Sequence, residues 1–306
     1  MLTDKQKTAR EGTLGSSDAP VVAGLSPYKS PLTLYYELHG DLPRYSDEET
    51  AYQRIGSRLE PVIAEIAADE LGLSIRRCPP KLSRLHPFMS ANLDFEIVNN
   101  PKGPGIFEIK NRAGQRPWEQ LPEDIELQAR HQLAVTNREW GIVAAMFQFG
   151  TIRHYEIERD QELEAYLIEI EGRFMVRVEK GNPPDTTWNK EGLELLKKLY
   201  PRDSGKTITL DSPEAAAMVA QYLGCREVLK DMEAKEAAAK GWIQAAMQDA
   251  STASVPGYTL TWKSTKPSKR FDEEAFKAAH PDLYQYYIAE RPGYRRFLLK
   301  TAKEIV

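Results

Sequence analysis

The chain has 306 residues, enough for one large domain with an appendage or for two ordinary domains. Hydrophobic residues make up 41% and charged residues 28%, which excludes a fibrous, a largely disordered or a membrane class of protein. The formal net charge of -4 argues against DNA binding, because Lys and Arg make the contacts to phosphate. The charge is uneven, however: residues 251–306 carry +4 and residues 1–250 carry -8.

Two features of the sequence bear on its cellular compartment. No stretch approaches the roughly 20 apolar residues of a bilayer helix, and the first residues lack the apolar core of a signal peptide. We therefore expect a cytoplasmic protein with no membrane partner. The cysteines, Cys78 and Cys225, have neither the spacing of a zinc site nor the number needed for an iron–sulfur cluster, so we expect two buried free thiols.

The first part of the chain predicts helices followed by a hairpin. A short helix is expected over residues 32–39, between segments rich in Gly, Ser and Pro. Apolar residues at helical spacing predict a second helix over residues 49–71, in which Pro61 indicates a kink or a restart. The turn sequence NNPKGPG then joins two strands of a hairpin, near residues 90–98 and 106–111.

The next elements alternate between helix and strand. We predict a helix over residues 122–136, strands over residues 140–149 and 151–158, and a helix over residues 161–178.

The composition changes after GNPPDTTW at residues 181–188. We predict a long Ala-rich helix over residues 213–249, a hairpin or extended strand at 257–263, and a final helical region. The pattern favours an α/β domain over residues 1–185, with a mixed sheet flanked by helices, and a mainly helical extension over residues 186–306.

Asp94 and the tripeptide Glu108-Ile109-Lys110 are the residues that indicate a catalytic site. Alternate side chains of a strand share a face, so Glu108 and Lys110 point together to one side while Ile109 enters the core. The predicted hairpin brings Asp94 alongside them. Two converging carboxylates make a hard oxygen site suited to Mg²⁺, and Lys110 can position or activate a water for phosphodiester hydrolysis.

The Glu-x-Lys pattern is short, and chance supplies about one or more copies at this content of charged residues. A second copy, Glu233-Ala234-Lys235, lies in the predicted long helix with no strand and no acidic residue in a preceding hairpin. The order helix, acidic hairpin, helix, strand favours the first copy. This order is the core order of the PD-(D/E)xK nuclease superfamily.

Four separated blocks resemble the lambda-exonuclease or YqaJ-like phage recombination nucleases, over about residues 10–185. The blocks are REGTLGSSDAPVVAGLSPY, GSRLEP, the strands with ANLD and FEIKN, and LQARHQLAVTN. The resemblance implies a PD-(D/E)xK exonuclease that uses Mg²⁺, with Mn²⁺ as a substitute. It would remove the 5′ strand from double-stranded DNA ends, leaving 3′ single strands for an annealing recombinase. A homotrimer in the cytoplasm of a bacterial or phage-infected host cell is also implied.

The resemblance assigns roles to three groups of residues. The metal ligands would be Asp94, Glu108 and the carbonyl of Ile109. The side chains that assist them would be Glu60 at the metal site, Lys110 at the nucleophile, and Gln128 beside the nucleophile or Lys110. The side chains that hold a terminal 5′ phosphate would be Arg10, Ser17 and Arg116.

The chain departs from the family pattern away from the metal ligands. Ser16 replaces a glycine, Arg130 replaces the second glutamine of the Gln-rich helix, and Phe95 stands where a glycine often follows the aspartate. Asn92 occupies a place where a serine can serve the phosphate pocket. The phosphate pocket therefore rests on fewer matches than the metal site.

Two alternatives stay open at this point. One is an endonuclease, structure-specific or tolerant of sequence, on the same core, and the other is a non-catalytic DNA-binding protein that retains the fold. The basic C-terminal part is equally ambiguous, because it could bind DNA through phosphates and stacking or be a solvated surface. Its residues are Trp262, Lys263, Lys266, Lys269, Arg270 and Phe271.

Overall fold

The computed structural model of the chain describes residues 12–45, 50–185, 190–290 and 293–300. The chain divides into two compact units, Met1–Pro201 and Arg202–Val306. The first unit includes α7 (Lys190–Leu199), whereas the sequence predicts a domain boundary between residues 185 and 186. No helix within the described ranges is long and apolar enough to cross a membrane.

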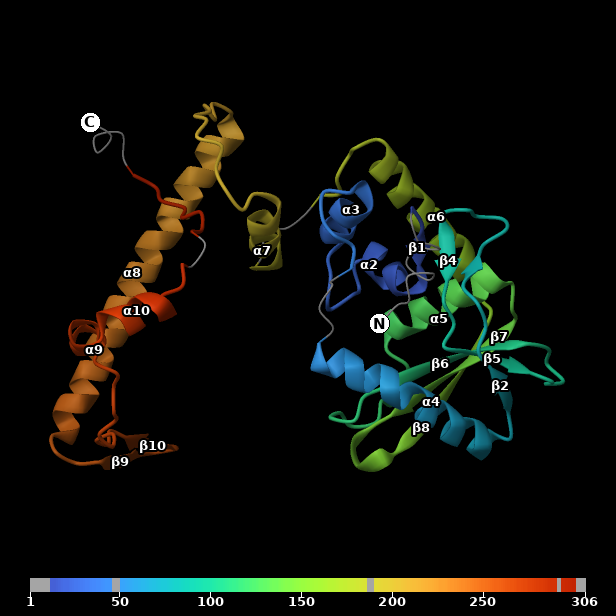
Figure 1. Ribbon diagram of the computed structural model, residues 1–306, viewed down its shortest axis with the longest axis horizontal. Helices are drawn as coiled ribbons and strands as arrows, with labels where there is room; N and C mark the ends of the chain where they lie inside the picture. The colour runs from blue at the N-terminus through green and yellow to red at the C-terminus, as the bar shows by residue number, and fades with distance from the viewer. Residues whose placement is uncertain (1–11, 46–49, 186–189, 291–292, 301–306) are drawn as a thin grey trace. The chain divides into compact units, whose positions relative to one another are not determined.

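A mixed sheet forms the centre of the first unit (Figure 1). β6 and β7 run parallel, whereas the other neighbouring strands are antiparallel. This sheet confirms the predicted α/β class, and the β5–β6 pair is the predicted hairpin. In order across the sheet, the strands are β2 (Ser74–Arg76), β5 (Phe95–Val98), β6 (Gly105–Asn111), β7 (Trp140–Met146) and β8 (Ile152–Glu158).

The single strand predicted over residues 90–98 is wrong, because two strands of different sheets share this segment. β4 (Met89–Ala91) pairs with β1 (Leu14–Gly15) and with β3 (Lys81–Leu82), whereas β5 begins only at Phe95. The chain changes sheet at residues 92–94, where the carboxylate of Asp94 accepts a hydrogen bond from the backbone N–H of Ile109. Asp94 therefore stands just before β5 and not within it.

Two helices cover the two faces of the central sheet. α4 (Ala51–Leu71) packs against Phe107 and Ile109, while α5 (Glu123–Thr136) packs on the side of Ile106. Alternate residues of β6 therefore face different helices, as the pleat of a strand requires. Burying each large apolar side chain in these layers stabilises the fold by about 1.5–3 kcal/mol.

α4 is one continuous helix, so the restart proposed at Pro61 does not occur. A capping box starts the helix: Thr50 Oγ1 accepts the N–H of Gln53, and the Gln53 side chain accepts the N–H of Thr50. Gly72 ends it in the left-handed region, at φ 62°. Pro61 removes one hydrogen bond of the helix, and the packing of α4 on the sheet offsets this loss.

Short elements at the start of the chain pack against a later helix, α6, in a third apolar cluster that includes Leu14, Tyr35 and Phe174. A 3₁₀ turn, η2, separates β7 from β8. The elements are η1 (Ser16–Asp18), α2 (Ala19–Val22), α3 (Pro31–His39), η2 (Gln148–Gly150) and α6 (Gln161–Glu179).

A buried ion pair ties β5 to the turn before β7. Arg138 donates to Glu96 and, at 2.7 Å, to the carbonyl of Gly105, and both charged side chains are less than 10% exposed. Arg76 donates to the other carboxylate oxygen of Glu96 at 2.6 Å. Burial alone would raise the pKa of Glu96, but the hydrogen bonds from Arg76 and Arg138 hold that pKa below its usual value.

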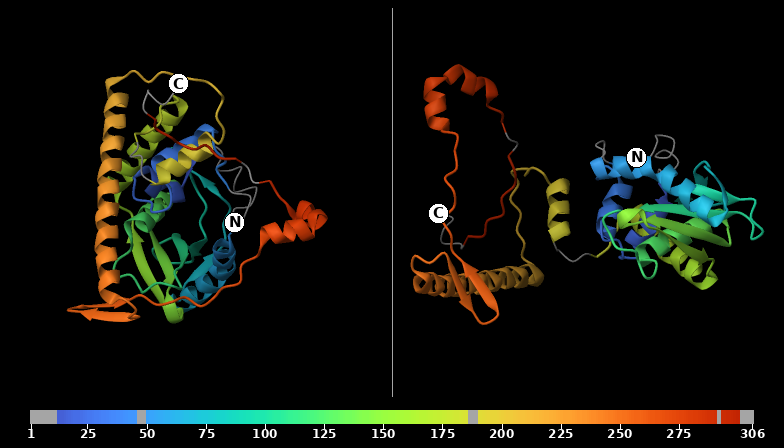
Figure 2. Two further views of the ribbon diagram at one scale, coloured as in Figure 1. Left: turned by 90° about the vertical axis from the view of Figure 1, so that its left-hand side faces the viewer. Right: turned by 90° about the horizontal axis from the view of Figure 1, so that it is seen from below.

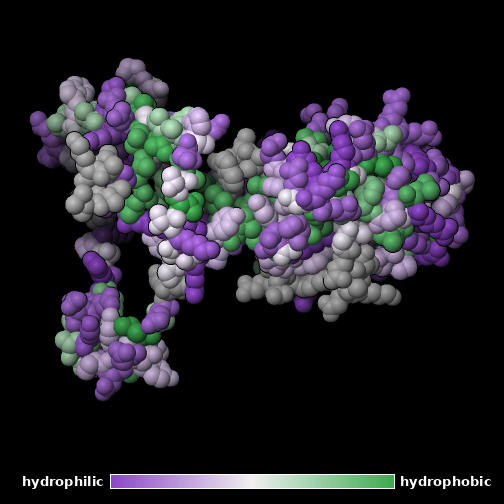
Figure 3. Space-filling model, turned by 90° about the horizontal axis from the view of Figure 1, so that it is seen from above, coloured by the Kyte–Doolittle hydropathy of each residue, from purple (hydrophilic) through white to green (hydrophobic). Residues whose placement is uncertain are grey.

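The second unit contains α8 (Pro213–Met247), a long helix whose side chains are mostly exposed. It is followed by a hairpin of β9 (Thr252–Val255) and β10 (Tyr258–Thr261), then by α9 (Glu273–Ala279) and α10 (Pro281–Tyr287) (Figure 2). Residues 293–300 are not helical, so the predicted final helical region stops short of them. Polar and apolar side chains intermingle on the surface of this unit (Figure 3).

The expectation of two buried thiols is wrong. Cys78 is only partly buried, and Cys225 is exposed on α8. Isolated cysteines are most often buried, but α8 buries little more than Met247 near its end. The thiol of Cys225 therefore stays at the surface of the second unit.

Candidate active site

Glu108 and Lys110 share the face of β6 that α5 covers. Lys110 Nζ donates to Glu108 Oε1 at 2.6 Å and to Gln128 Oε1 at 2.9 Å. Gln128 Nε2 in turn donates to Glu108 Oε1 at 2.6 Å. Glu108 is only 3% exposed, so these charge-assisted hydrogen bonds stabilise its buried carboxylate. The structure thus brings together three of the predicted site residues.

Gln132 is a further member of this cluster that the sequence motifs did not predict. It lies one helical turn after Gln128, is fully buried, and donates through Nε2 to Glu108 Oε2 at 2.7 Å. Its Oε1 atom is buried with no hydrogen-bond partner among the described residues. The spacing of four residues on α5 was the available signal, because it places both glutamines on one face. Arg130 instead pairs with Glu126 at 2.6 Å.

Asp94 approaches the same cluster from the start of β5. Its Oδ2 accepts the backbone N–H of Ile109 at 2.8 Å. Burial raises the pKa of Asp94 well above its usual value, and the negative charges of Glu108 and Glu60 raise it further. Lys110 and the Ile109 hydrogen bond only partly oppose this effect. A cation in this position would relieve the repulsion between the carboxylates.

Glu60 lies on α4, beside Arg77, whose Nη2 atom is 3.3 Å from Glu60 Oε1. Burial raises the pKa of Glu60, the guanidinium of Arg77 lowers it, and the charge of Glu108 raises it again. Glu60, Asp94 and Glu108 therefore interact electrostatically although they come from three different parts of the fold. The family motif pointed to all three.

The donor set can be tested against a divalent metal ion. Among the described residues, no group of three or more His, Cys, Asp and Glu side chains has the arrangement of a metal site. Mg²⁺ does not require such a group, because it is bound through one or two carboxylates together with waters and substrate phosphates. Asp94 and Glu108 supply two hard carboxylates, and the pKa of Asp94 is raised first by burial and then by the charge of Glu108. These residues fit a hard divalent cation.

The structure describes two of the three residues expected to hold a 5′ phosphate. Arg10 lies outside the described residues. Ser17 is exposed on η1, and Arg116 is exposed in the loop between β6 and α5. Asn92, at the related serine position, has both amide atoms buried with no hydrogen-bond partner in the described part of the chain. The phosphate pocket stays a prediction.

A second polar cluster joins α5 to elements outside the central sheet. His131 and Glu171 are both fully buried, and His131 Nδ1 is 2.8 Å from Glu171 Oε1. The other ring nitrogen, Nε2, is 3.0 Å from the carbonyl oxygen of Ser90. Burial lowers the pKa of His131, but the Glu171 carboxylate and the Ser90 carbonyl outweigh it, so the pKa is raised overall. The cluster ties together α5, α6 and β4.

This cluster predicts a pH-dependent stability. Because the folded pKa of His131 is raised, its contribution is fully present below the unfolded value of about 6.5 and is lost as pH rises through the folded value. The free energy of unfolding, measured by urea denaturation from pH 6 upward, should fall more steeply in the wild type than in His131→Gln. His86→Gln is the control, since His86 has no buried carboxylate partner among the described residues. Parallel curves for the wild type and His131→Gln would contradict this assignment.

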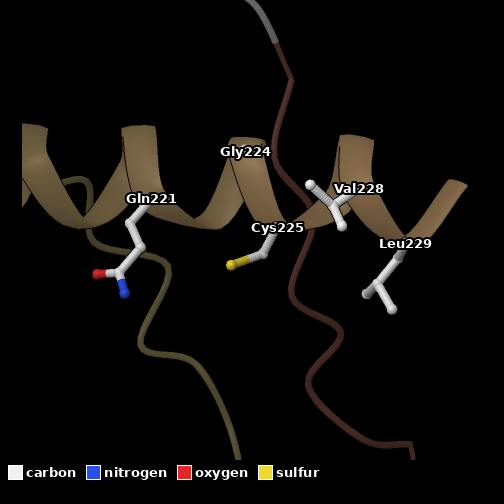
Figure 4. Close-up of a pocket in the computed structure, with 5 residues that line it drawn as sticks. All are labelled: Gln221, Gly224, Cys225, Val228 and Leu229. Carbon is white, nitrogen blue, oxygen red and sulfur yellow. The ribbon is translucent and has the colours of Figure 1, made fainter. Parts of the chain in front are cut away.

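A surface pocket of about 580 Å³ on α8 is not a candidate for this chemistry. Its lining residues carry no charged side chain (Figure 4), and none of them belongs to the predicted site. They are Gln221, Gly224, Cys225, Val228 and Leu229. The polar cluster around Glu108 is the better candidate, because it combines buried carboxylates, a lysine and a perturbed pKa.

The mixed sheet between helices, with an acid before β5 and Glu-x-Lys on β6, defines an α/β protein with a PD-(D/E)xK core. Residues 6–139 match the family model of the YqaJ-like viral recombinase domain. The resemblance to this family that the motifs predicted is therefore confirmed by a match over residues 6–139.

Individual proteins are similar to larger parts of the chain. The uncharacterized protein YqaJ of Bacillus subtilis is 29% identical over 312 residues, covering 98% of this chain and 95% of its own. An alkaline exonuclease from Laribacter hongkongensis matches 61% of this chain and 94% of its own, with 20% identity and a TM-score of 0.48. A phage-related exonuclease from Haemophilus somnus matches 55% and 96%, with 13% identity and a TM-score of 0.42.

Proposed function

We propose that the protein is a metal-dependent DNA exonuclease that removes the 5′ strand from double-stranded ends and leaves 3′ single strands for recombination. The observation that carries the proposal is the convergence of Asp94, Glu108 and Lys110, with Gln128 bonded to both Glu108 and Lys110. The match to the YqaJ-like viral recombinase domain supports the choice of DNA as substrate. The 5′ to 3′ direction rests on the family resemblance.

The metal would be held by Asp94, Glu108 and the carbonyl of Ile109, with Mg²⁺ as the natural ion and Mn²⁺ as a substitute. When bound, a divalent ion polarises the phosphoryl oxygen and lowers the pKa of an attacking water. Lys110 Nζ would orient that water toward phosphorus. The water oxygen would form the new bond to phosphorus and give up a proton to solvent, while the bond from phosphorus to the 3′ oxygen breaks and that oxygen takes up a proton from solvent.

The glutamines and Glu60 assist this chemistry. Gln128 limits the freedom of Lys110, because its Oε1 accepts from Nζ at 2.9 Å. Gln132 fixes the orientation of the Glu108 carboxylate through Oε2. Glu60 adds negative charge near Asp94 and Glu108, which strengthens the attraction for a cation.

The proposal is tested with linear duplex DNA labelled at either the 5′ or the 3′ end, in the presence of Mg²⁺. Prompt release of the 5′ label, with no cutting of closed circular DNA, is the expected result. Cutting of the circle would instead identify an endonuclease on the same core. Binding to DNA without turnover in Mg²⁺ or Mn²⁺ would identify a non-catalytic DNA-binding protein and overturn the proposal.

Gln132 gives a finer test of the site. Gln132→Met keeps a similar volume and removes the donor to Glu108 Oε2. A hydrogen bond to a charged group is worth about 1.5–3 kcal/mol, so we expect kcat to fall by roughly tenfold or more. Arg130→Gln, on the same helix but paired with Glu126, should leave kcat near the wild-type value. Equal rates for wild type and Gln132→Met would remove Gln132 from the site.

The homotrimer and the annealing recombinase partner belong to the same proposal, and both rest on the family resemblance. Light scattering of the purified protein measures the mass in solution, and a trimer corresponds to three chains of 34.7 kDa. A monomeric mass at working concentration would argue against the homotrimer.

A further inference from the structure

A basic segment follows the hairpin of the second unit. The segment, residues 262–271, reads WKSTKPSKRF and has neither helix nor strand along its length. All of its residues are exposed, including Trp262 at 46% and Phe271 at 65%. Figure 2 shows it as an extended connection between β10 and α9. It contains four cations and no acidic residue: Lys263, Lys266, Lys269 and Arg270.

The three acidic residues that follow the basic segment, Asp272, Glu273 and Glu274, form no ion pair with its cations in the described part of the chain. Asp272 Oδ1 caps α9 by accepting the N–H of Ala275 at 2.9 Å. Glu273 Oε1 accepts the hydroxyl of Tyr284 at 2.7 Å. Within the described ranges, no ion pair joins any of the four cations to a carboxylate. Four neighbouring cations thus face solvent, a charge pattern complementary to a polyanion.

The aromatic residues at the two ends add a second kind of contact. The backbone N–H of Trp262 donates to the carbonyl of Ser251 at 3.0 Å, which fixes the start of the segment at the hairpin while the indole ring stays exposed. Phe271 contacts Phe276 of α9, with ring centroids 5.0 Å apart, which fixes the other end. An extended segment of this length spans about 30 Å. Cations between two exposed rings match the groups that bind single-stranded nucleic acids, since unpaired bases can stack on aromatic rings.

We propose that the basic segment binds single-stranded DNA, with its four cations on phosphates and Trp262 stacked on a base. A single strand is favoured over a duplex because the bases of a duplex are already stacked on one another and offer no free face to the indole. That the bound strand is the 3′ strand left by digestion rests on the proposed function. Binding itself does not depend on turnover.

The test uses the full chain with a fluorescent oligothymidine and with EDTA present, so that nuclease activity plays no part. Lys263→Gln/Lys266→Gln should weaken binding and lower the slope of log Kd against log salt concentration by about 1.4, or roughly 0.7 for each phosphate that is no longer neutralised. The matched control is Lys230→Gln/Lys240→Gln, which removes two exposed lysines of α8 in the same unit. This control should leave the affinity and the slope unchanged.

A second pair of variants isolates the stacking contact. Trp262→Ala should weaken oligothymidine binding by about tenfold, because a bound base loses the ring on which it stacks. Trp242→Ala removes another exposed tryptophan, 75% exposed on α8, and should have no effect. Thermal melting checks that each variant is folded.

Three outcomes would overturn the inference. Equal losses of affinity in the α8 control variants would mean that binding is unspecific. Equal affinity of the wild type for a duplex of the same length, unaffected by Trp262→Ala, would mean phosphate contacts without stacking. Binding of phosphatidylserine vesicles without binding of oligothymidine would make the segment a membrane contact. The assay contains no divalent metal, so it measures binding without cleavage. Its result therefore tests the binding proposal even if the protein proves unable to cut DNA.

Discussion

Lys110→Ala is expected to reduce the rate of DNA hydrolysis by about 10²–10⁴-fold, the range for a side chain that positions or activates the nucleophile. Lys110 Nζ contacts Glu108 and Gln128, so the substitution removes the only ammonium group within hydrogen-bond distance of Glu108 among the described residues. The rate of release of the 5′ label from linear duplex DNA in Mg²⁺ measures the effect.

The second copy of the tripeptide provides a matched control for Lys110. Lys235 also follows a glutamate by two positions, but it lies on α8, exposed and paired with Asp231 at 2.7 Å. The Lys235→Ala variant should therefore cleave DNA at the wild-type rate. If Lys110→Ala retained more than about a tenth of the wild-type rate, the lysine would have no direct part in the proposed chemistry.

Arg138→Ala is expected to lower the free energy of unfolding by about 3–5 kcal/mol, the usual cost of leaving one charge of a buried pair unpaired. Glu96 would keep Arg76 but lose Arg138, and the carbonyl of Gly105 would lose its donor. Urea denaturation at neutral pH measures the change.

An exposed ion pair of the same first unit provides the comparison for Arg138. Arg173 and Glu169 are one turn apart on α6, and their side chains are 67% and 61% exposed. Arg173→Ala should change the free energy of unfolding by less than about 1 kcal/mol. A decrease of the same small size in Arg138→Ala would mean that water or Arg76 compensates the buried carboxylate.

Much of the candidate site could be predicted from strand periodicity. The alternation along β6 puts Glu108 and Lys110 on one face whatever the neighbouring helix is, so their contact followed from the sequence alone. The role of Gln132 did not, because its contact with Glu108 depends on how α5 is rotated above the sheet. The family motif places its second glutamine at position 130, but Arg130 pairs with Glu126.

The errors in the predicted fold also arise from tertiary contacts that the local sequence does not reveal. Residues 89–98 contain no Gly or Pro to mark a break, so they read as one strand, and only the pairing partners reveal two sheets. Pro61 costs a hydrogen bond, but the apolar contacts of Ile63 and its neighbours with the sheet hold α4 together. Local sequence signals miss both effects because the deciding contacts join residues distant in the chain.

The hydrogen bond between Asp94 and Ile109 has a consequence for how the sequence can change. Its donor belongs to the main chain of β6, so every residue type except proline supplies it at position 109. The side chain at position 109 needs only to pack in the apolar layer under α4, where Ile109 is 7% exposed. Apolar residues can therefore replace one another at position 109 over evolutionary time while the carboxylate of Asp94 stays anchored to the strand that carries Glu108.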